Sequence, residues 1–118
     1  MIHLILHFII PLLISKTFIE HFYVNNSILK KIKLSNLAII WLLMVSTMLI
    51  DIDHLLTTPI YQADRCSVGF HPLHMVLPIS LYIFLCFPKK TRIFGVGLII
   101  HIILDSIDCQ VNSGVWFV

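Results

Sequence analysis

Four apolar stretches make up most of this chain and restrict it to one kind of architecture. They cover residues 2–14, 34–50, 72–87 and 93–107, and the segments between them hold nearly every charged residue. Hydrophobic residues make up 58% of the 118 positions and charged residues only 12%, and the mean hydropathy is +0.98. Soluble domains do not have this composition. We therefore expect an integral membrane protein.

The apolar stretches predict an all-α fold. Each stretch is at or below the roughly 20 residues that a helix needs to cross a bilayer, so some helices must extend into flanking residues. The prediction is one domain, a four-helix transmembrane bundle over about 2–24, 34–56, 72–87 and 93–110. We interpret the first stretch as a helix rather than a cleaved signal peptide, because no Lys or Arg precedes it.

The charges predict how the bundle is oriented. With four spans, seven of the eight cations fall on one side, which the positive-inside rule makes cytoplasmic. They are Lys16, Lys30, Lys31, Lys33, Lys89, Lys90 and Arg92. Both termini then lie on the outer side, and five of the six acids, Asp64 included, belong to the outer half with six of the seven histidines. No basic tract is interleaved with aromatic residues, so nucleic acid is not an expected partner.

Spacing groups the outer acids and histidines on helix faces. Residues three or four apart share a face of a helix, and this spacing relates His3 to His7, Asp51 to His54, His71 to His74, His101 to Asp105, and Asp105 to Asp108. Asp53 does not share a face with Asp51 in a regular helix. Either the helix loosens there, which Pro59 downstream allows, or Asp53 supports a ligand from behind.

This convergence predicts a metal site. An unpaired Asp near the bilayer centre costs about 2.5 to 3.5 kcal/mol, and mixed imidazole and carboxylate ligands suit zinc, with manganese or iron as alternatives, in one or two ions. The predicted ligands are His7, Asp51, Asp53, His54, His74, His101 and Asp105. His3, His71 and Arg65 are expected to support them, and Asp53 or Asp108 to act as general base for hydrolysis by an activated water.

The same residues carry a resemblance. His7, DIDH at 51–54, the paired histidines at 71 and 74, and HIILD at 101–105 resemble the YdjM-like family of membrane-bound metal-dependent hydrolases. The chain as a whole also resembles short bacterial membrane proteins of unknown function. The first resemblance implies a multi-pass protein of the bacterial inner (plasma) membrane with Asp and His ligands to a divalent metal.

The resemblance is weakest at the central histidine element. That element resembles H-R-G-x-T-H in the family, whereas the two histidines are three apart in HPLH here. Of the two, we favour His74 as ligand, since His71 precedes Pro72 and is biased toward extended backbone. Arg65, the only outer-side cation, is the candidate for holding an anionic substrate in place of the missing Arg.

The predicted function is hydrolysis of a lipid or envelope phosphoester, with the site facing the periplasm or exterior and membrane lipid as partner. One alternative is a b-type haem protein with His7 and His101 as axial ligands, and another is a divalent-metal-binding subunit. Two alternatives give these residues a purely structural role: a solvated helix end at Asp51 to His54, and a buried ion pair between His101 and Asp105.

The remaining expectations are structural. A disulfide between Cys66 and Cys109 is one reading of two cysteines on the oxidising side, and metal ligation by one of them is the other. Tyr82 is assigned to packing or to the membrane interface, and Gly95 and Gly97 to close helix approach. Four short helices barely enclose a site, which leaves a homodimer open.

Overall fold

The fold is all-α: the described residues contain four α-helices and no strand. The computed structural model describes residues 2–22, 24, 27, 31, 34–60, 62 and 65–118. Lys30, Lys33 and Asp64, which entered the predicted topology, lie outside them. The helices are α1 (Ile2–Thr17), α3 (Asn36–Ser46), α4 (Val76–Leu85) and α5 (Arg92–Ser113), with 3₁₀ segments η1 (Ile19–His21), η2 (Thr47–Leu56) and η3 (Pro72–His74).

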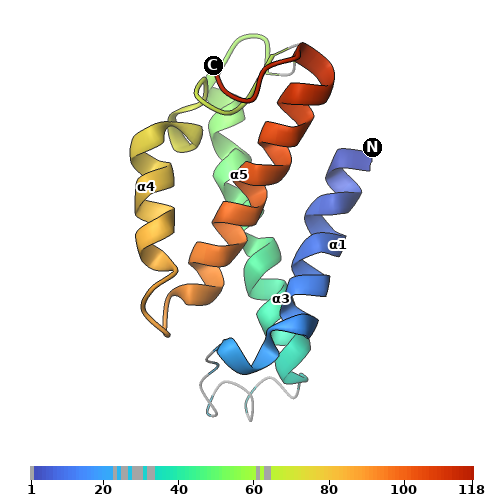
Figure 1. The fold of residues 1–118 in the computed structure, drawn as a ribbon, viewed down its shortest axis with the longest axis vertical. Coiled ribbons are helices and arrows are strands. Elements are labelled where there is room, and N and C mark those ends of the chain that lie inside the picture. Colours follow the sequence, from blue (N-terminus) through green and yellow to red (C-terminus); the bar gives the residue numbers. More distant parts are fainter. Residues whose placement is uncertain are drawn as a thin grey trace.

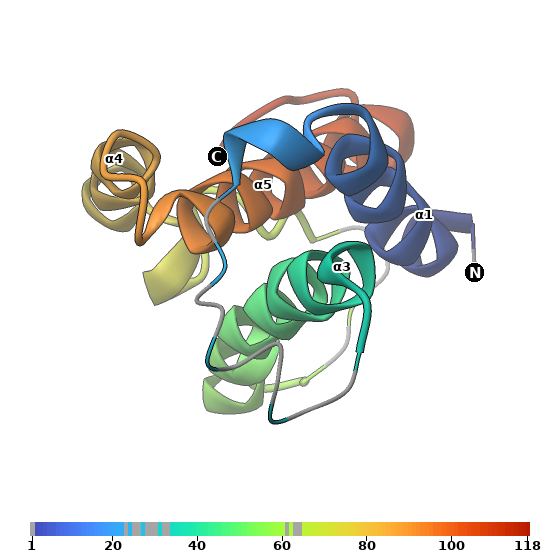
Figure 2. The same cartoon turned by 90° about the horizontal axis from the view of Figure 1, so that it is seen from below.

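Helix α5 is the centre of the bundle. It packs against α1, α3 and α4, and Figure 2 shows α1 and α4 on either side of it, with α3 across its face. Gly97 allows the close approach to α3, because a Cβ atom there would lie 2.9 Å from Thr47 Cγ2 and 3.1 Å from Met44 Cα. The contact brings the start of η2 beside the part of α5 that leads to His101.

Both termini lie at the same end of the bundle as the connection that carries Cys66 (Figure 1). We call this the site end. The turn between α4 and α5 lies at the opposite end (Figure 1), which we call the apolar end. A buried apolar cluster lies there. It consists of Phe22, which follows η1, Ile40 and Met44 from α3, and Ile93 from α5.

The second predicted helix changes its geometry halfway. Its α-helical part ends at Ser46 and continues without a break as the 3₁₀ segment η2. Ser46 Oγ donates to Leu43 O and Thr47 Oγ1 to Met44 O, both at 2.6 Å, and such bonds from hydroxyls back to the preceding turn loosen a helix. The helix therefore does loosen before Asp51 and Asp53, starting at a Ser-Thr pair rather than at Pro59.

The third helix is shorter than the prediction of 72–87. Pro78 has no N–H to donate to the His74 carbonyl, and its ring would clash with that carbonyl in a continuous helix. The chain instead forms η3, becomes extended at Met75 (φ −84°, ψ 167°), and begins α4 at Val76. The freed His74 carbonyl accepts from the Gly69 N–H at 2.9 Å, so the break holds His74 at the site end.

Two helical segments are long and apolar enough to cross a membrane, by length and composition. They are Asn36–Leu56, which joins α3 and η2, and α5, whereas α1 and α4 are shorter apolar helices. Large apolar side chains cover the outside of the short helices: Leu4, Ile5, Leu13, Leu77, Leu81 and Phe84 are all exposed. Buried positions hold many polar residues, among them His7, Asp53, His74, His101 and Asp105.

Candidate metal centre

Four side chains meet at the site end and form what we call the four-residue cluster. They are Asp51 from η2, His74 from η3, and His101 and Asp105 from α5. His74 Nε2 lies 3.1 Å from Asp105 Oδ2, 3.4 Å from Asp51 Oδ1 and 3.4 Å from His101 Nε2. His101 Nε2 lies 3.1 Å from Asp51 Oδ1 and 3.3 Å from Asp105 Oδ2. Each of these atoms can ligate a metal.

These separations fit one tetrahedral ion. Zinc binds imidazole nitrogen and carboxylate oxygen at about 2.0–2.2 Å, which in a tetrahedron puts neighbouring ligand atoms about 3.3–3.6 Å apart. The separations of 3.1–3.4 Å in the cluster lie at or just below this value. Asp105 Oδ2 is also buried and accepts no hydrogen bond from the described residues. A buried carboxylate oxygen needs a positive partner. A protonated His74 or His101 supplies one as an ion pair, and with neutral imidazoles the donor set fits a divalent cation.

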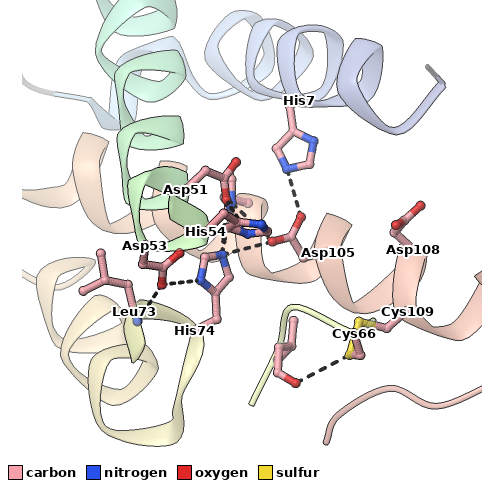
Figure 3. Close-up of polar contacts among 12 residues, drawn as sticks. His7, Asp51, Asp53, His54, Cys66, Leu73, His74, Asp105, Asp108 and Cys109 are labelled. Atoms are coloured by element: carbon pink, nitrogen blue, oxygen red, sulfur yellow. Dashed lines mark hydrogen bonds and ion pairs between the residues drawn. A yellow bond between two sulfur atoms is a disulfide. The ribbon is translucent and has the colours of Figure 1, made fainter. Parts of the chain in front are cut away.

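Asp53 holds His74 in place from behind. Its Oδ2 accepts from the Leu73 N–H at 2.8 Å and lies 3.2 Å from His74 Nδ1, as Figure 3 shows. A carboxylate at Nδ1 keeps the proton there and leaves the Nε2 lone pair free for a metal. Asp53 is 1% exposed and lies outside the four-residue cluster. Through Oδ2, Asp53 has the geometry of support behind a ligand. Its Oδ1 is buried without a hydrogen-bond partner among the described residues, and Asp53 has metal-ligand spacing to His54 and His71.

Tyr82 contributes to the same support, which sequence reasoning assigned only to packing or to the interface. It is buried, and its hydroxyl donates to the Leu73 carbonyl at 2.9 Å. Leu73 is thus held through its N–H by Asp53 and through its carbonyl by Tyr82. The one sequence signal for this arrangement is Pro78, which breaks the helix and makes η3 a separate turn.

His3 and His7 lie on the other side of Asp105. His3 Nε2 is 3.0 Å and His7 Nε2 3.4 Å from Asp105 Oδ1, and these three residues make a second group with metal-ligand spacing, which we call the three-residue cluster. In Figure 3 the Asp105 carboxylate lies between His7 and His74. The predicted ligand His7 therefore meets Asp105 but is outside the four-residue cluster.

His54 and His71 form a stacked pair beside the four-residue cluster. Their ring centroids are 3.8 Å apart with an interplanar angle of 18°, and His54 Nε2 lies 3.5 Å from Asp51 Oδ1. Burial lowers the pKa of the His71 imidazole, and neighbouring His54 acts in the same direction. The neutral form of His71 is thus favoured. The predicted ligand His54 flanks Asp51, and with Asp53 and His71 it forms a third group with metal-ligand spacing.

A cavity of about 770 Å³ opens onto these clusters. Its polar lining includes Asp51, Asp105 and Asp108, and its apolar lining includes Ile2 and Ile60. Asp108, a predicted general base, has a half-exposed side chain that lies 3.8 Å from His3 Nδ1.

Arg65, the expected anion-binding residue, also lines the cavity. Its Nη2 donates to Thr57 Oγ1, Pro59 O and Ile60 O at 2.9–3.2 Å, and its guanidinium lies 5.0 Å from the centre of the Phe70 ring. Arg65 therefore shapes the wall of the cavity, and part of its hydrogen-bonding capacity is used by its own connection.

A disulfide joins Cys66 to Cys109. It links the connection that lines the cavity to α5, one turn beyond Asp105 (Figure 3). Both cysteines are buried in an apolar cluster with Val68, Tyr82 and Ile102. The bond therefore ties the cavity wall to the helix that carries two of the four clustered side chains.

Comparison with known proteins places the chain in a family without assigning its chemistry. No curated protein and no solved structure matches the chain. The sequence profile of a family of unknown function, DUF6122, matches residues 1–112. That range includes every residue of the three clusters and both cysteines of the disulfide. The chain belongs to the DUF6122 family of unknown function.

Proposed function

We propose that this chain is a membrane-embedded, metal-dependent hydrolase whose substrate is a lipid or envelope phosphoester. The observation that carries the proposal is the four-residue cluster, in which two imidazole nitrogens and two carboxylate oxygens lie 3.1–3.4 Å apart in five of their six pairs. The YdjM-like resemblance of the residues involved points to the same class of chemistry.

The distribution of polar and apolar side chains supports a membrane location. Apolar side chains cover the outside of α1 and α4, while histidine and aspartate are buried inside. This arrangement suits lipid, where polar groups must turn inward to find partners. Lys89 and Lys90 lie between Leu85, where α4 ends, and Arg92, the first residue of α5. This turn is at the end of the bundle opposite the termini (Figure 1), so under the positive-inside rule we propose that the site lies in the outer half of the membrane.

Zinc is the metal that the cluster favours. Two imidazoles and two carboxylates in tetrahedral spacing match zinc, whereas manganese prefers six oxygen-rich ligands. Where such an ion keeps an open coordination position, it would polarise a phosphoryl oxygen and lower the pKa of a coordinated water. The protein's own contribution is to hold His74 through Asp53 and to form a cavity that both polar and apolar side chains line.

Asp108 is the general base in this proposal. Its carboxylate is half-exposed, lines the cavity and lies outside the four-residue cluster, so it can take a proton from a water beside the substrate. Ile2, Leu4 and Ile60 on the cavity lining provide apolar surface for acyl chains, in the same cavity as the polar side chains where a phosphate headgroup would lie.

The haem alternative has less support. Axial histidines must approach iron from opposite faces of a porphyrin, but the rings of His7 and His101 are in edge contact, with centroids 4.5 Å apart. This contact leaves no space between the rings for a macrocycle. His7 and His101 also lie beside Asp105, which suits a small divalent cation.

Metal analysis of detergent-purified protein tests the proposal. We expect stoichiometric zinc in the wild type and a lower zinc content in Asp51→Ala, with Glu20→Ala as a matched control, because Glu20 is an exposed acid remote from the clusters. The wild type should then release phosphate or headgroup from phospholipid vesicles. Neither the wild type treated with chelator nor Asp108→Ala should do so. Absence of bound metal would refute the whole proposal. Bound metal without turnover of any phosphoester lipid would favour the metal-binding subunit instead.

A further inference from the structure

The two carboxylate oxygens of Asp105 face two different pairs of histidines. Oδ2 faces His74 and His101 at 3.1 and 3.3 Å, whereas Oδ1 faces His3 and His7 at 3.0 and 3.4 Å. The residue is 6% exposed and is shared by the four-residue and three-residue clusters. A carboxylate placed in this way can bridge two ions, which then lie about 3.5–4 Å apart as in two-metal sites.

The orientation of His7 indicates what lies next to Oδ1. His7 Nδ1 is 3.0 Å from the His3 carbonyl oxygen, and a carbonyl only accepts, so Nδ1 carries the ring proton. In the neutral ring, His7 Nε2 then presents a lone pair toward Asp105 Oδ1 at 3.4 Å. This nitrogen has no hydrogen-bond partner among the described residues, and His7 is 4% exposed. Two buried electron-pair donors that face each other call for a cation between them.

We propose that His3 Nε2, His7 Nε2 and Asp105 Oδ1 hold a second divalent cation, which Asp105 bridges to the ion of the proposed hydrolytic site. The inference rests on the proposed function for the first ion, but it concerns different ligand atoms and can fail separately. Asp108 lies 3.8 Å from His3 Nδ1, on the side of the ring away from Asp105.

The second site supplies what the first lacks. A zinc ion with four protein ligands is coordinatively filled, as in structural sites, whereas catalytic zinc keeps three protein ligands and an open position. The three-residue cluster offers three ligands, and His3, with about a third of its side chain exposed, lines the cavity. The open coordination position of the pair therefore faces the cavity from the second ion, and the first ion holds the bridging carboxylate in place.

The test measures metal stoichiometry in purified protein that is stripped with chelator, reloaded with zinc and desalted. We expect about two ions per chain in the wild type and about one in both His3→Ala and His7→Ala, as for loss of one ion from a two-metal site. His3→Ala is included in case His7→Ala does not fold. Because the His3 ring is partly exposed, its removal leaves no buried cavity. His21→Ala is the matched control, since His21 is an exposed histidine outside the clusters and should keep both ions.

Spectroscopy gives a second readout without activity. Loaded with manganese, the wild type should give the electron paramagnetic resonance spectrum of a spin-coupled pair, and His7→Ala the spectrum of an isolated ion. One ion in the wild type, unaffected by His3→Ala and His7→Ala but lost in His101→Ala, would overturn the second site and leave the first intact. No bound ion in the wild type would overturn both.

Discussion

The two ends of the bundle contrast in the chemistry of their buried side chains. At the apolar end, Ile40, Met44 and Ile93 are almost fully buried and pack on one another. At the site end, His74, His101 and Asp53 are buried to the same degree. Buried polar atoms without a hydrogen-bond partner among the described residues include His7 Nε2 and Asp105 Oδ2 and are concentrated at the site end.

The two ends therefore differ in role: the apolar end stabilises the fold, and the site end holds the clustered histidines and aspartates. Apolar packing lowers the free energy of the folded state without any ligand, whereas buried imidazoles and carboxylates without partners raise it. A bound cation offsets that penalty because it binds only the folded protein. Changes at the site end should therefore alter metal binding, and changes at the apolar end should alter stability alone.

The largest effect is expected for Asp105→Ala. It removes the carboxylate shared by both clusters, so the affinity for zinc should fall by more than about a hundredfold, beyond the range seen when supporting residues are lost. Competition with a chromophoric chelator measures the affinity. Glu20→Ala, at the opposite end of the bundle, should match the wild type. If folded Asp105→Ala kept the full affinity for zinc, the clusters at the site end would not be the metal site.

Met44→Ala tests the apolar end. Met44 is 1% exposed and packs against the position of Gly97 on α5, so truncation should leave a cavity and destabilise the fold by about 2–4 kcal/mol. Thermal unfolding in detergent, followed by circular dichroism, measures the loss. Leu77→Ala, at a side chain that is 83% exposed, is the control and should change little. If folded Met44→Ala protein also loses its zinc, the two ends are not independent.

Asp53→Ala should weaken zinc binding by about 10–100-fold, because His74 Nδ1 loses the carboxylate that keeps Nε2 free for the metal. Asp53→Asn should lie between this variant and the wild type, since an amide oxygen in the place of Oδ2 can accept both hydrogen bonds but carries no negative charge. The chelator competition used for Asp105 applies here. Identical affinities for all three proteins would show that Asp53 does not position His74.

The smallest effect is expected for Ser15→Ala. Ser15 Oγ donates to Pro11 O at 2.6 Å and lies 3.4 Å from Met44 Sδ, and such contacts between membrane helices contribute about 0.6 kcal/mol on average. Zinc affinity should not change. Ser80 donates in the same way to the Val76 carbonyl on α4. Ser80→Ala is therefore the control for loss of the bond within one helix, and any additional loss in Ser15→Ala is due to the contact with Met44. A larger loss in Ser80→Ala than in Ser15→Ala would contradict this assignment.

Much of the layout of the site can be read from spacing along the chain. Residues three or four apart share a helix face wherever a helix forms, so the pairing of His101 with Asp105 follows from the sequence. The two separate directions of the Asp105 oxygens do not, since they depend on how α1 and η3 are placed around α5. Spacing raises the possibility that Asp53 supports a ligand, but it does not identify His74 as that ligand, because the contact depends on a change of helix type at Ser46 and Thr47.

The sequence by itself determined an all-α chain with apolar stretches, and it concentrated acids and histidines toward one end, because hydropathy and helical periodicity are local properties. Only the tertiary structure decided which atoms meet. Pro78 breaks a helix that the apolar pattern predicts as continuous, and the resulting turn brings His74 rather than His71 to His101 and Asp105. Contacts between side chains far apart in sequence depend on helix register and crossing, which the local pattern does not encode.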